Sequence, residues 1–222
     1  MIPQAPVPSR RIPARLAIAT VAILLAGFAL VYLIHVLLLS REGSPFALLI
    51  AIGWTVACAV ATSLGSRHRL AGLLLTALAL AAAVGHWEWL EGHVDAVYLI
   101  QHAGSHAVLG IWFGGSLIAS RNGTGLALIS RFATRVHGSL PPPILRYTVQ
   151  VTAVWTGYFL SMALASCALF AFGSLQAWST LANLVTLPLT VGIFIGEYLV
   201  RLRLHPDFEH VSIIEGVRAF MK

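Results

Sequence analysis

Charged residues are scarce in this sequence of 222 residues. Asp, Glu, Lys and Arg make up only 10% of it, whereas 58% is hydrophobic and the mean hydropathy is +0.85. A soluble domain carries about 25% charged residues, so this chain cannot cover a water-exposed surface, and the composition excludes a soluble enzyme. It also excludes an intrinsically disordered chain, because disorder requires low hydrophobicity and high charge.

Cysteine is equally rare, since the chain contains two. Two cysteines exclude a disulfide-rich secreted scaffold and a zinc cage built from Cys ligands. The few charges are mostly basic, with 14 Lys and Arg against 8 Asp and Glu and a net charge of +6. In a soluble protein this excess would indicate nucleic acid. In so apolar a chain it is typical of cytoplasmic membrane loops, and we expect no nucleic-acid partner.

Long apolar runs are what the sequence does contain. A transmembrane helix needs about 20 mostly apolar residues, and six stretches meet this requirement. The predicted spans are Leu16–Leu39, Phe46–Leu64, Leu70–Leu90, Asp95–Ala119, Val149–Gly173 and Thr180–Val200. They predict an all-α integral membrane bundle of six transmembrane helices over residues 16–200. Residues 1–15 are expected to form an extended basic N-terminal tail, and residues 201–222 a cytoplasmic C-terminal tail.

The distribution of basic residues predicts the orientation of this bundle. With the N-terminus placed inside, every Lys and Arg except Arg41 falls on the inner side. The positive-inside rule therefore predicts an N-in/C-in topology.

Two segments on the inner side carry further helix signals. Residues 120–148 place apolar residues and arginines on different sides of a helix, namely Leu128, Ile129, Phe132 and Val136 against Arg131 and Arg135. This pattern predicts a short amphipathic helix on the inner leaflet, with an ordinary solvated loop as the alternative. Ser212 and Glu215 have capping-box spacing, which predicts a final helix near Ile213–Phe220.

The fourth span contains polar residues that are costly inside a membrane and therefore need a reason. His102 and His106 stand at i and i+4, so they share one helix face, which Gly110 and Gly114 continue. Because small residues let helices approach closely, this face is predicted to point into the bundle. The same glycines could instead join two copies, so a homodimer is a second reading.

Other polar residues are predicted to gather on the outer half of the bundle, around a polar, partly hydrated cavity that opens outward. The candidate cluster consists of His35, His86, Glu88, Glu91, His93, Asp95, Gln101, His102, His106 and Asn183. Near the inner end of the last span, Glu197 and Arg201 have the spacing of a structural ion pair.

The histidines allow several kinds of chemistry. His102-x-x-x-His106 is a spacing at which two histidines on one helix can bind the same metal ion, and His86 is the candidate third ligand. It would suit zinc or iron in an enzyme acting on lipid, and a b-type haem held by two histidines is another hypothesis. A proton or substrate pathway is a third. Plain hydrogen bonding between helices explains the pair equally well. No complete catalytic signature is present, so no catalytic residue or cofactor is assigned.

Several motifs resemble those of a family of six-span bacterial inner-membrane proteins. They are His86-x-Glu88-Trp89-x-Glu91-Gly92-His93-x-Asp95, Gln101-His102-Ala103-Gly104-x-His106, Arg146-Tyr147-Thr148-x-Gln150-Val151-Thr152, Ala182-Asn183-Leu184-Val185-Thr186-Leu187-Pro188 and Gly196-Glu197-Tyr198-Leu199-Val200-Arg201. Members of that family have no assigned biochemical activity, and their genes tend to lie beside type II fatty-acid-synthase-like genes, in clusters similar to those for aryl polyene lipids. The last two spans also distantly resemble the intracellular septation protein A family.

This resemblance implies a context rather than a mechanism. We expect an accessory or scaffold factor in envelope lipid or aryl polyene biosynthesis or export, located in the bacterial cytoplasmic membrane. Its expected partners are membrane lipids and, at the inner face, an acyl carrier protein or the pathway synthases. The alternatives are a metal- or haem-dependent lipid-modifying enzyme that uses the His102/His106 face, and a small transporter or flippase.

Overall fold

The computed structural model describes residues 14–40 and 43–205 of the chain. Over these residues the fold is all-α, as predicted, and contains no strand. The elements are α1 (Ala14–Leu39), α2 (Ser44–Leu64), α3 (Arg69–Gly85), α4 (Trp87–Gly92), α5 (Val94–Arg121), α6 (Leu128–His137), α7 (Pro142–Phe172), α8 (Leu175–Ser179), the π-helix η2 (Thr180–Val185) and α9 (Thr186–Leu204). Most of both predicted tails, and the helix predicted near Ile213–Phe220, lie outside the described residues.

Three helices are long and apolar enough to cross a membrane, which makes a multi-pass membrane protein plausible. They are Ser44–Leu64, Pro142–Phe172 and the continuous stretch Leu175–Leu204. A further apolar helix, Arg69–Gly85, is shorter, and the part of α1 from Leu25 to Leu39 is also apolar. The 17 residues of α3 reach only about 26 Å, less than the hydrocarbon core of about 30 Å. The long helix α5 is not one of the three candidate spans, because its glutamine amide and histidine side chains lower its hydropathy.

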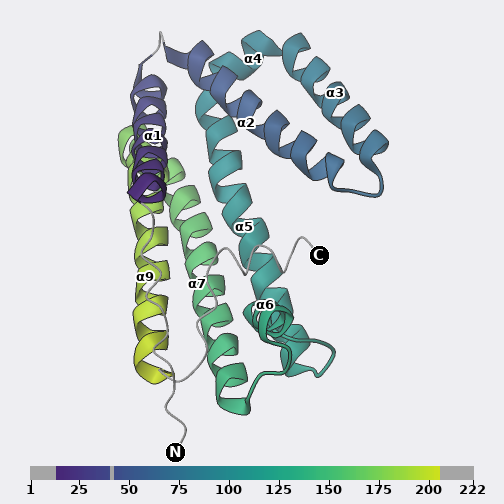
Figure 1. Ribbon diagram of the computed structural model, residues 1–222. Helices are drawn as coiled ribbons and strands as arrows, with labels where there is room; N and C mark the ends of the chain where they lie inside the picture. Colours follow the sequence, from purple (N-terminus) through teal and green to yellow (C-terminus); the bar gives the residue numbers. More distant parts are fainter. Residues whose placement is uncertain (1–13, 41–42, 206–222) are drawn as a thin grey trace, which may run out of the picture.

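Three long helices form the body of the molecule. In Figure 1, α5, α7 and α9 run side by side, and α1 lies beside η2 at one end. The α2–α3 hairpin leans away from this body and meets it near α4. The opposite end contains α6, the end of α5, the start of α7 and the end of α9 (Figure 1).

Among the described helices, α5 and α7 make the most extensive contact. A Cβ atom placed on Gly110 would lie 2.6 Å from Cδ2 of Leu160, and one on Gly114 would lie 3.2 Å from Cγ2 of Thr156. The glycine face of α5 therefore points at α7, as its small residues require. These glycines serve packing within the chain, and the homodimer stays a prediction.

Two of the predicted spans are not single regular helices. The segment Leu70–Leu90 breaks at His86, whose φ of −114° and ψ of 25° leave the α-helical region, so α3 ends at Gly85 and α4 begins at Trp87. The sixth span begins in η2 rather than in an α-helix. Since Pro188 has no N–H to give to the carbonyl four residues earlier, the α-helical ladder is incomplete just after this wider turn.

The other predicted helices form with small differences in their ends. Helix α7 begins at Pro142, earlier than predicted, because proline suits the first helical turn, where no N–H bond is needed. The predicted amphipathic helix is present as α6, and its place on the inner leaflet stays a prediction. Alanine at position 127 cannot cap α6, and its first amides bind side chains of neighbouring helices instead. The Leu128 amide donates to Oγ of Ser116 at 2.9 Å, and the Ile129 amide to Oγ1 of Thr152 at 3.2 Å.

Candidate functional site

His102 lies at the centre of a buried hydrogen-bond network that joins α5, α7 and the start of α9. Its Nδ1 is 3.0 Å from Oγ of Ser166, and its Nε2 is 3.0 Å from Oγ1 of Thr186. The Ser166 oxygen also accepts from Nε1 of Trp178 at 2.9 Å. Ser166 and Trp178 are both fully buried. A polar side chain from the middle of α5 thus ties together three elements that are distant in sequence.

The chemistry of the partners assigns the hydrogens in this network. The Trp178 indole can only donate, so Ser166 accepts from it and has its own hydrogen free for His102 Nδ1. The Thr186 hydroxyl donates to the carbonyl of Leu181 at 2.8 Å, so it accepts from Nε2–H of His102. All hydrogen bonds are therefore satisfied with a neutral imidazole. A charged imidazole would place a second N–H against Ser166 and displace the serine hydrogen.

His106 lies beside His102 but contacts different groups. Its Nδ1 donates to the carbonyl of His102 at 2.7 Å, and the centres of the two rings are 4.5 Å apart. The ring faces two aromatic side chains of α7, with the centre of Phe159 at 6.0 Å and that of Tyr158 at 6.2 Å. The two histidines share a helix face, as their spacing requires, but they are placed in different surroundings.

A second set of polar contacts, centred on Ser179, lies next to the His102 network in the chain. Nδ1 of His35 is 2.9 Å from Oγ of Ser179, the residue after Trp178. Asn183 donates from Nδ2 to the same oxygen at 3.1 Å and to the Ser179 carbonyl at 3.2 Å. His35 and Asn183 therefore meet through Ser179, a fully buried serine that the sequence did not single out.

The two remaining histidines and the carboxylates of the predicted outer cluster lie at the α4 corner, apart from this network. Glu91 Oε2 accepts from the indole of Trp87 at 3.1 Å, within α4 itself. His93 donates from Nδ1 to the carbonyl of Trp89 at 2.8 Å and stacks on its ring at 4.5 Å. Asp95 accepts from the amide of the next residue at 2.8 Å. These contacts are local, and the side chains of His86 and Glu88 are exposed at the same corner.

The metal hypothesis needs His86, His102 and His106 to meet. Within residues 14–40 and 43–205, no group of three His, Cys, Asp or Glu side chains is placed to hold a metal ion. Both nitrogens of His102 already contact hydroxyl groups. The candidate ligands therefore do not form a coordination set in this arrangement.

Gln101 faces away from His102 and ties α5 to α2. Its Nε2 donates to the Ala51 carbonyl at 2.9 Å and to Oγ1 of Thr55 at 2.7 Å. One turn earlier, the hydroxyl of Tyr98 donates to the Ala47 carbonyl at 2.8 Å. Adjacent residues of α5 therefore serve two different walls of the molecule.

Beyond these bonds a groove opens between the α2–α3 hairpin and α5. Its volume is about 490 Å³. Its lining is apolar apart from three polar residues, and consists of Leu48, Ile52, Thr55, Val56, Ala59, Leu75, Thr76, Ala79, Leu80, Ala83, Leu90, Val97, Ile100 and Gln101. A recess of about 470 Å³ at the α3–α4 bend shares Ala83 and Leu90 with it and adds His86 and Trp89. The recess and the groove are therefore neighbours, with Ala83 and Leu90 lining both.

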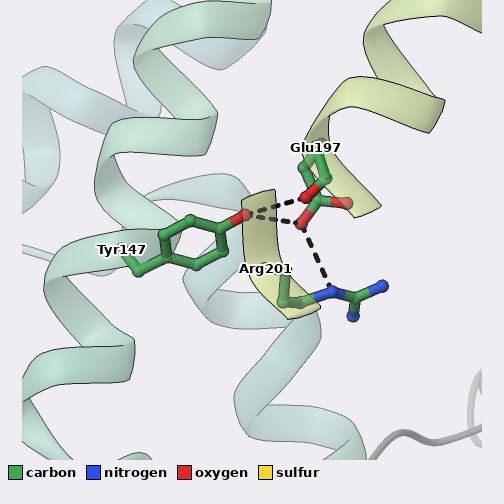
Figure 2. A network of polar contacts seen from close by, with 3 residues as sticks. All are labelled: Tyr147, Glu197 and Arg201. Carbon is green, nitrogen blue, oxygen red and sulfur yellow. Dashed lines mark hydrogen bonds and ion pairs between the residues drawn. The ribbon is translucent and has the colours of Figure 1, made fainter. Parts of the chain in front are cut away.

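The opposite end of the molecule holds the predicted ion pair. Nε of Arg201 is 3.5 Å from Oε1 of Glu197. The hydroxyl of Tyr147 donates to the same carboxylate oxygen at 3.1 Å and to the Glu197 carbonyl at 3.1 Å (Figure 2). Tyr147 belongs to α7, so the carboxylate of α9 is held from two elements.

The sequence singled out the histidines but missed most of their partners. Ser166 and Thr186 are hydroxyl side chains inside predicted spans and do not interrupt their apolar pattern, whereas Trp178 and Ser179 lie between the fifth and sixth predicted spans. Ser166 and His102 have the contact of a nucleophile and its base, but Ser166 is fully buried and no substrate can approach it. Comparison of the chain with family models, with curated proteins and with solved structures gave no match.

Proposed function

We propose that this protein is a six-helix, N-in/C-in protein of the bacterial inner membrane that holds a hydrophobic chain for other proteins to act on. The observation that supports the proposal is the apolar groove between the α2–α3 hairpin and α5. Its volume of about 490 Å³ lies within the range of about 300–1,000 Å³ that is usual for ligand sites. Two of its three polar side chains, Gln101 and Thr55, bind each other, and Thr76 donates to the carbonyl of Gly72.

Such a groove suits one acyl or polyene chain. Lipid tails and aliphatic side chains are equally apolar, so a chain from the bilayer enters without a desolvation cost. The recess at the α4 corner offers the head of the chain polar neighbours, His86 among them. An accessory role in envelope lipid or aryl polyene biosynthesis or export, as the sequence motifs imply, is the context that we propose for this site.

The distribution of charge supports the proposed orientation. Arginines gather at the end of the body that lies opposite α4, namely Arg121, Arg131, Arg135, Arg146, Arg201 and Arg203 (Figure 1). Acidic side chains lie at the α4 corner. With the basic end in the cytoplasm, α6 would rest on the inner leaflet, where an acyl carrier protein or a pathway synthase can meet it.

Neither alternative function is favoured by a specific observation. Metal or haem ligation by His102 would require one of its hydrogen bonds to hydroxyl groups to break. A flippase requires a polar route for the lipid head across the membrane, and the groove lining is mostly apolar.

Two tryptophan variants of α3 test the proposed groove. Ala79 lines the groove, whereas Ala81 on the same helix is exposed and is not part of that lining. We expect the parent and Ala81→Trp, purified from their native membrane in mild detergent, to carry a long-chain molecule that extraction and mass spectrometry identify. Ala79→Trp fills the groove and should lose it. The same molecule in all three proteins, or in none, would overturn the proposal.

A further inference from the structure

A second groove lies between α7 and α9, on the body of the molecule and away from the hairpin. Its volume is about 380 Å³. Val154 and Trp155 line it from α7, and Ile193 and Val200 line it from α9. Its polar side chains, Glu197 among them, all come from the inner half of these helices. The groove is thus apolar along its length and polar toward one end, the pattern of a site for an amphiphile.

The charges around the polar end are mostly positive. Glu197 already accepts a hydrogen bond from Tyr147 and pairs with Nε of Arg201, so its charge is neutralised (Figure 2). Within the described residues, Nε of Arg201 is buried and has no hydrogen-bond partner, and Figure 2 shows the end of the guanidinium directed away from Tyr147. Arg146 and Arg203 are exposed on the adjoining turns of α7 and α9. The polar end of the groove therefore has one carboxylate and three arginines nearby.

We propose that this α7–α9 groove binds one anionic phospholipid of the inner leaflet. Its acyl chain lies along Trp155 and Ile193, and its phosphate contacts the Arg201 guanidinium, with Arg146 and Arg203 adding charge. Basic pockets between membrane helices on the cytoplasmic side are suited to anionic headgroups. The inference uses the orientation given under the proposed function, but it concerns a different groove and a different ligand.

The apolar wall decides between a phospholipid and a free phosphate. A free phosphate needs only the arginines, whereas a phospholipid also fills the groove, so the two ligands respond differently to substitutions along α7. The bound state of Glu197 decides against a cationic amphiphile, because its carboxylate already has two partners.

The test measures lipid binding to the full-length protein in detergent by native mass spectrometry, with phosphatidylglycerol and phosphatidylcholine as the probes. We expect one phosphatidylglycerol to bind in preference to phosphatidylcholine. Removing one arginine charge near a headgroup weakens binding about fivefold, which is the effect expected of Arg201→Gln. Glu197→Gln, which removes the ion pair but keeps the guanidinium, should bind at least as well as the parent.

A second pair of variants tests the groove without altering charge. Val154 lines the groove, whereas Leu164, also exposed on α7, does not. Val154→Trp should lose the bound phosphatidylglycerol, and Leu164→Trp should keep it. Equal binding of the two lipids, unchanged binding in both Arg201→Gln and Val154→Trp, or full displacement by inorganic phosphate would overturn the proposal. Ala79→Trp belongs to the other groove and should leave this lipid in place, so each proposal can fail separately.

Discussion

The α5–α7–α9 body and the α2–α3 hairpin are held in different ways. In the body, polar side chains bind from helix to helix, as His102 does with Ser166 and Thr186. The close approach at Gly110 adds backbone contact. The hairpin meets α5 through Tyr98 and Gln101 near its upper end in Figure 1, and beyond that a groove separates the two.

This difference shows what fixes helices inside a membrane. The hydrophobic effect does not favour a neighbouring helix over lipid, so small residues and hydrogen bonds between helices decide the geometry. The contact between α5 and α7 has both and is closely packed. Between the hairpin and α5, the described side-chain hydrogen bonds are those of Tyr98 and Gln101, and the groove lies beyond them.

The largest expected effect comes from breaking the contact between α5 and α7. In Gly110→Leu the added side chain would meet Leu160, whose backbone N lies 3.3 Å from the Cβ position. We expect the free energy of unfolding to fall by about 3 kcal/mol, at the upper end of overpacking costs. Thermal unfolding in detergent measures it. Gly115→Leu, where no described atom lies within 4 Å of the Cβ position, should be nearly neutral; equal losses in both variants would contradict the assigned contact.

The second-largest effect is expected from removing the Ser166 hydroxyl, which His102 and Trp178 share. Ser166→Ala leaves the Trp178 indole and Nδ1 of His102 without their partner. Because buried unsatisfied groups cost about 1–3 kcal/mol each and some relaxation follows, we expect a loss of about 2 kcal/mol in the same unfolding assay. Ser161→Ala, at an exposed position of α7, is the control and should stay within about 0.5 kcal/mol of the parent. If Ser166→Ala unfolds like this control, the network does not stabilise the body.

A smaller effect is expected where Tyr147 of α7 binds Glu197 of α9. Tyr147→Phe keeps the ring but removes the hydroxyl that binds Glu197, and should cost about 1 kcal/mol. Tyr198→Phe changes an exposed ring that contributes only a contact to Arg201, 5.7 Å away. We expect this matched variant to unfold like the parent, and a larger loss in Tyr198→Phe than in Tyr147→Phe would reverse the assignment.

The smallest effect is expected in the hairpin. Ala79→Trp places its ring in the open groove rather than in a packed core. Its unfolding free energy should therefore remain within about 0.5 kcal/mol of that of Ala81→Trp, although its bound chain is lost. Unfolding temperatures measured after complete delipidation provide the comparison, and a large loss would mean that the hairpin packs more closely than described.

Periodicity and charge predicted several features of this molecule. The helical fold, the shared face of His102 and His106, the amphipathic helix α6 and the spacing of Glu197 and Arg201 all follow from residues a few positions apart. Such local patterns can be read directly, because a helix places residues i and i+4 together.

Other features depend on pairs that are distant in sequence. The bond between His35 and Ser179 joins residues separated by 144 positions. The predicted outer cluster separated into the His102 network, the contact of Gln101 with α2, and the α4 corner, which begins where the segment predicted as one span breaks at His86. Hydroxyl side chains such as Ser166 occur in apolar runs without any periodic signal, so their partners emerge only from packing.

The start of α6 has a consequence for the order in which the protein assembles. Its first amides bind Ser116 on α5 and Thr152 on α7, and its ten residues are too few to form a stable helix alone. During synthesis, Ser116 is made before α6, but Thr152 is made only after it. The amphipathic helix must therefore wait for α7 to be inserted beside α5. Amide hydrogen exchange at Leu128 and Ile129 during folding would then report the moment at which these two helices associate.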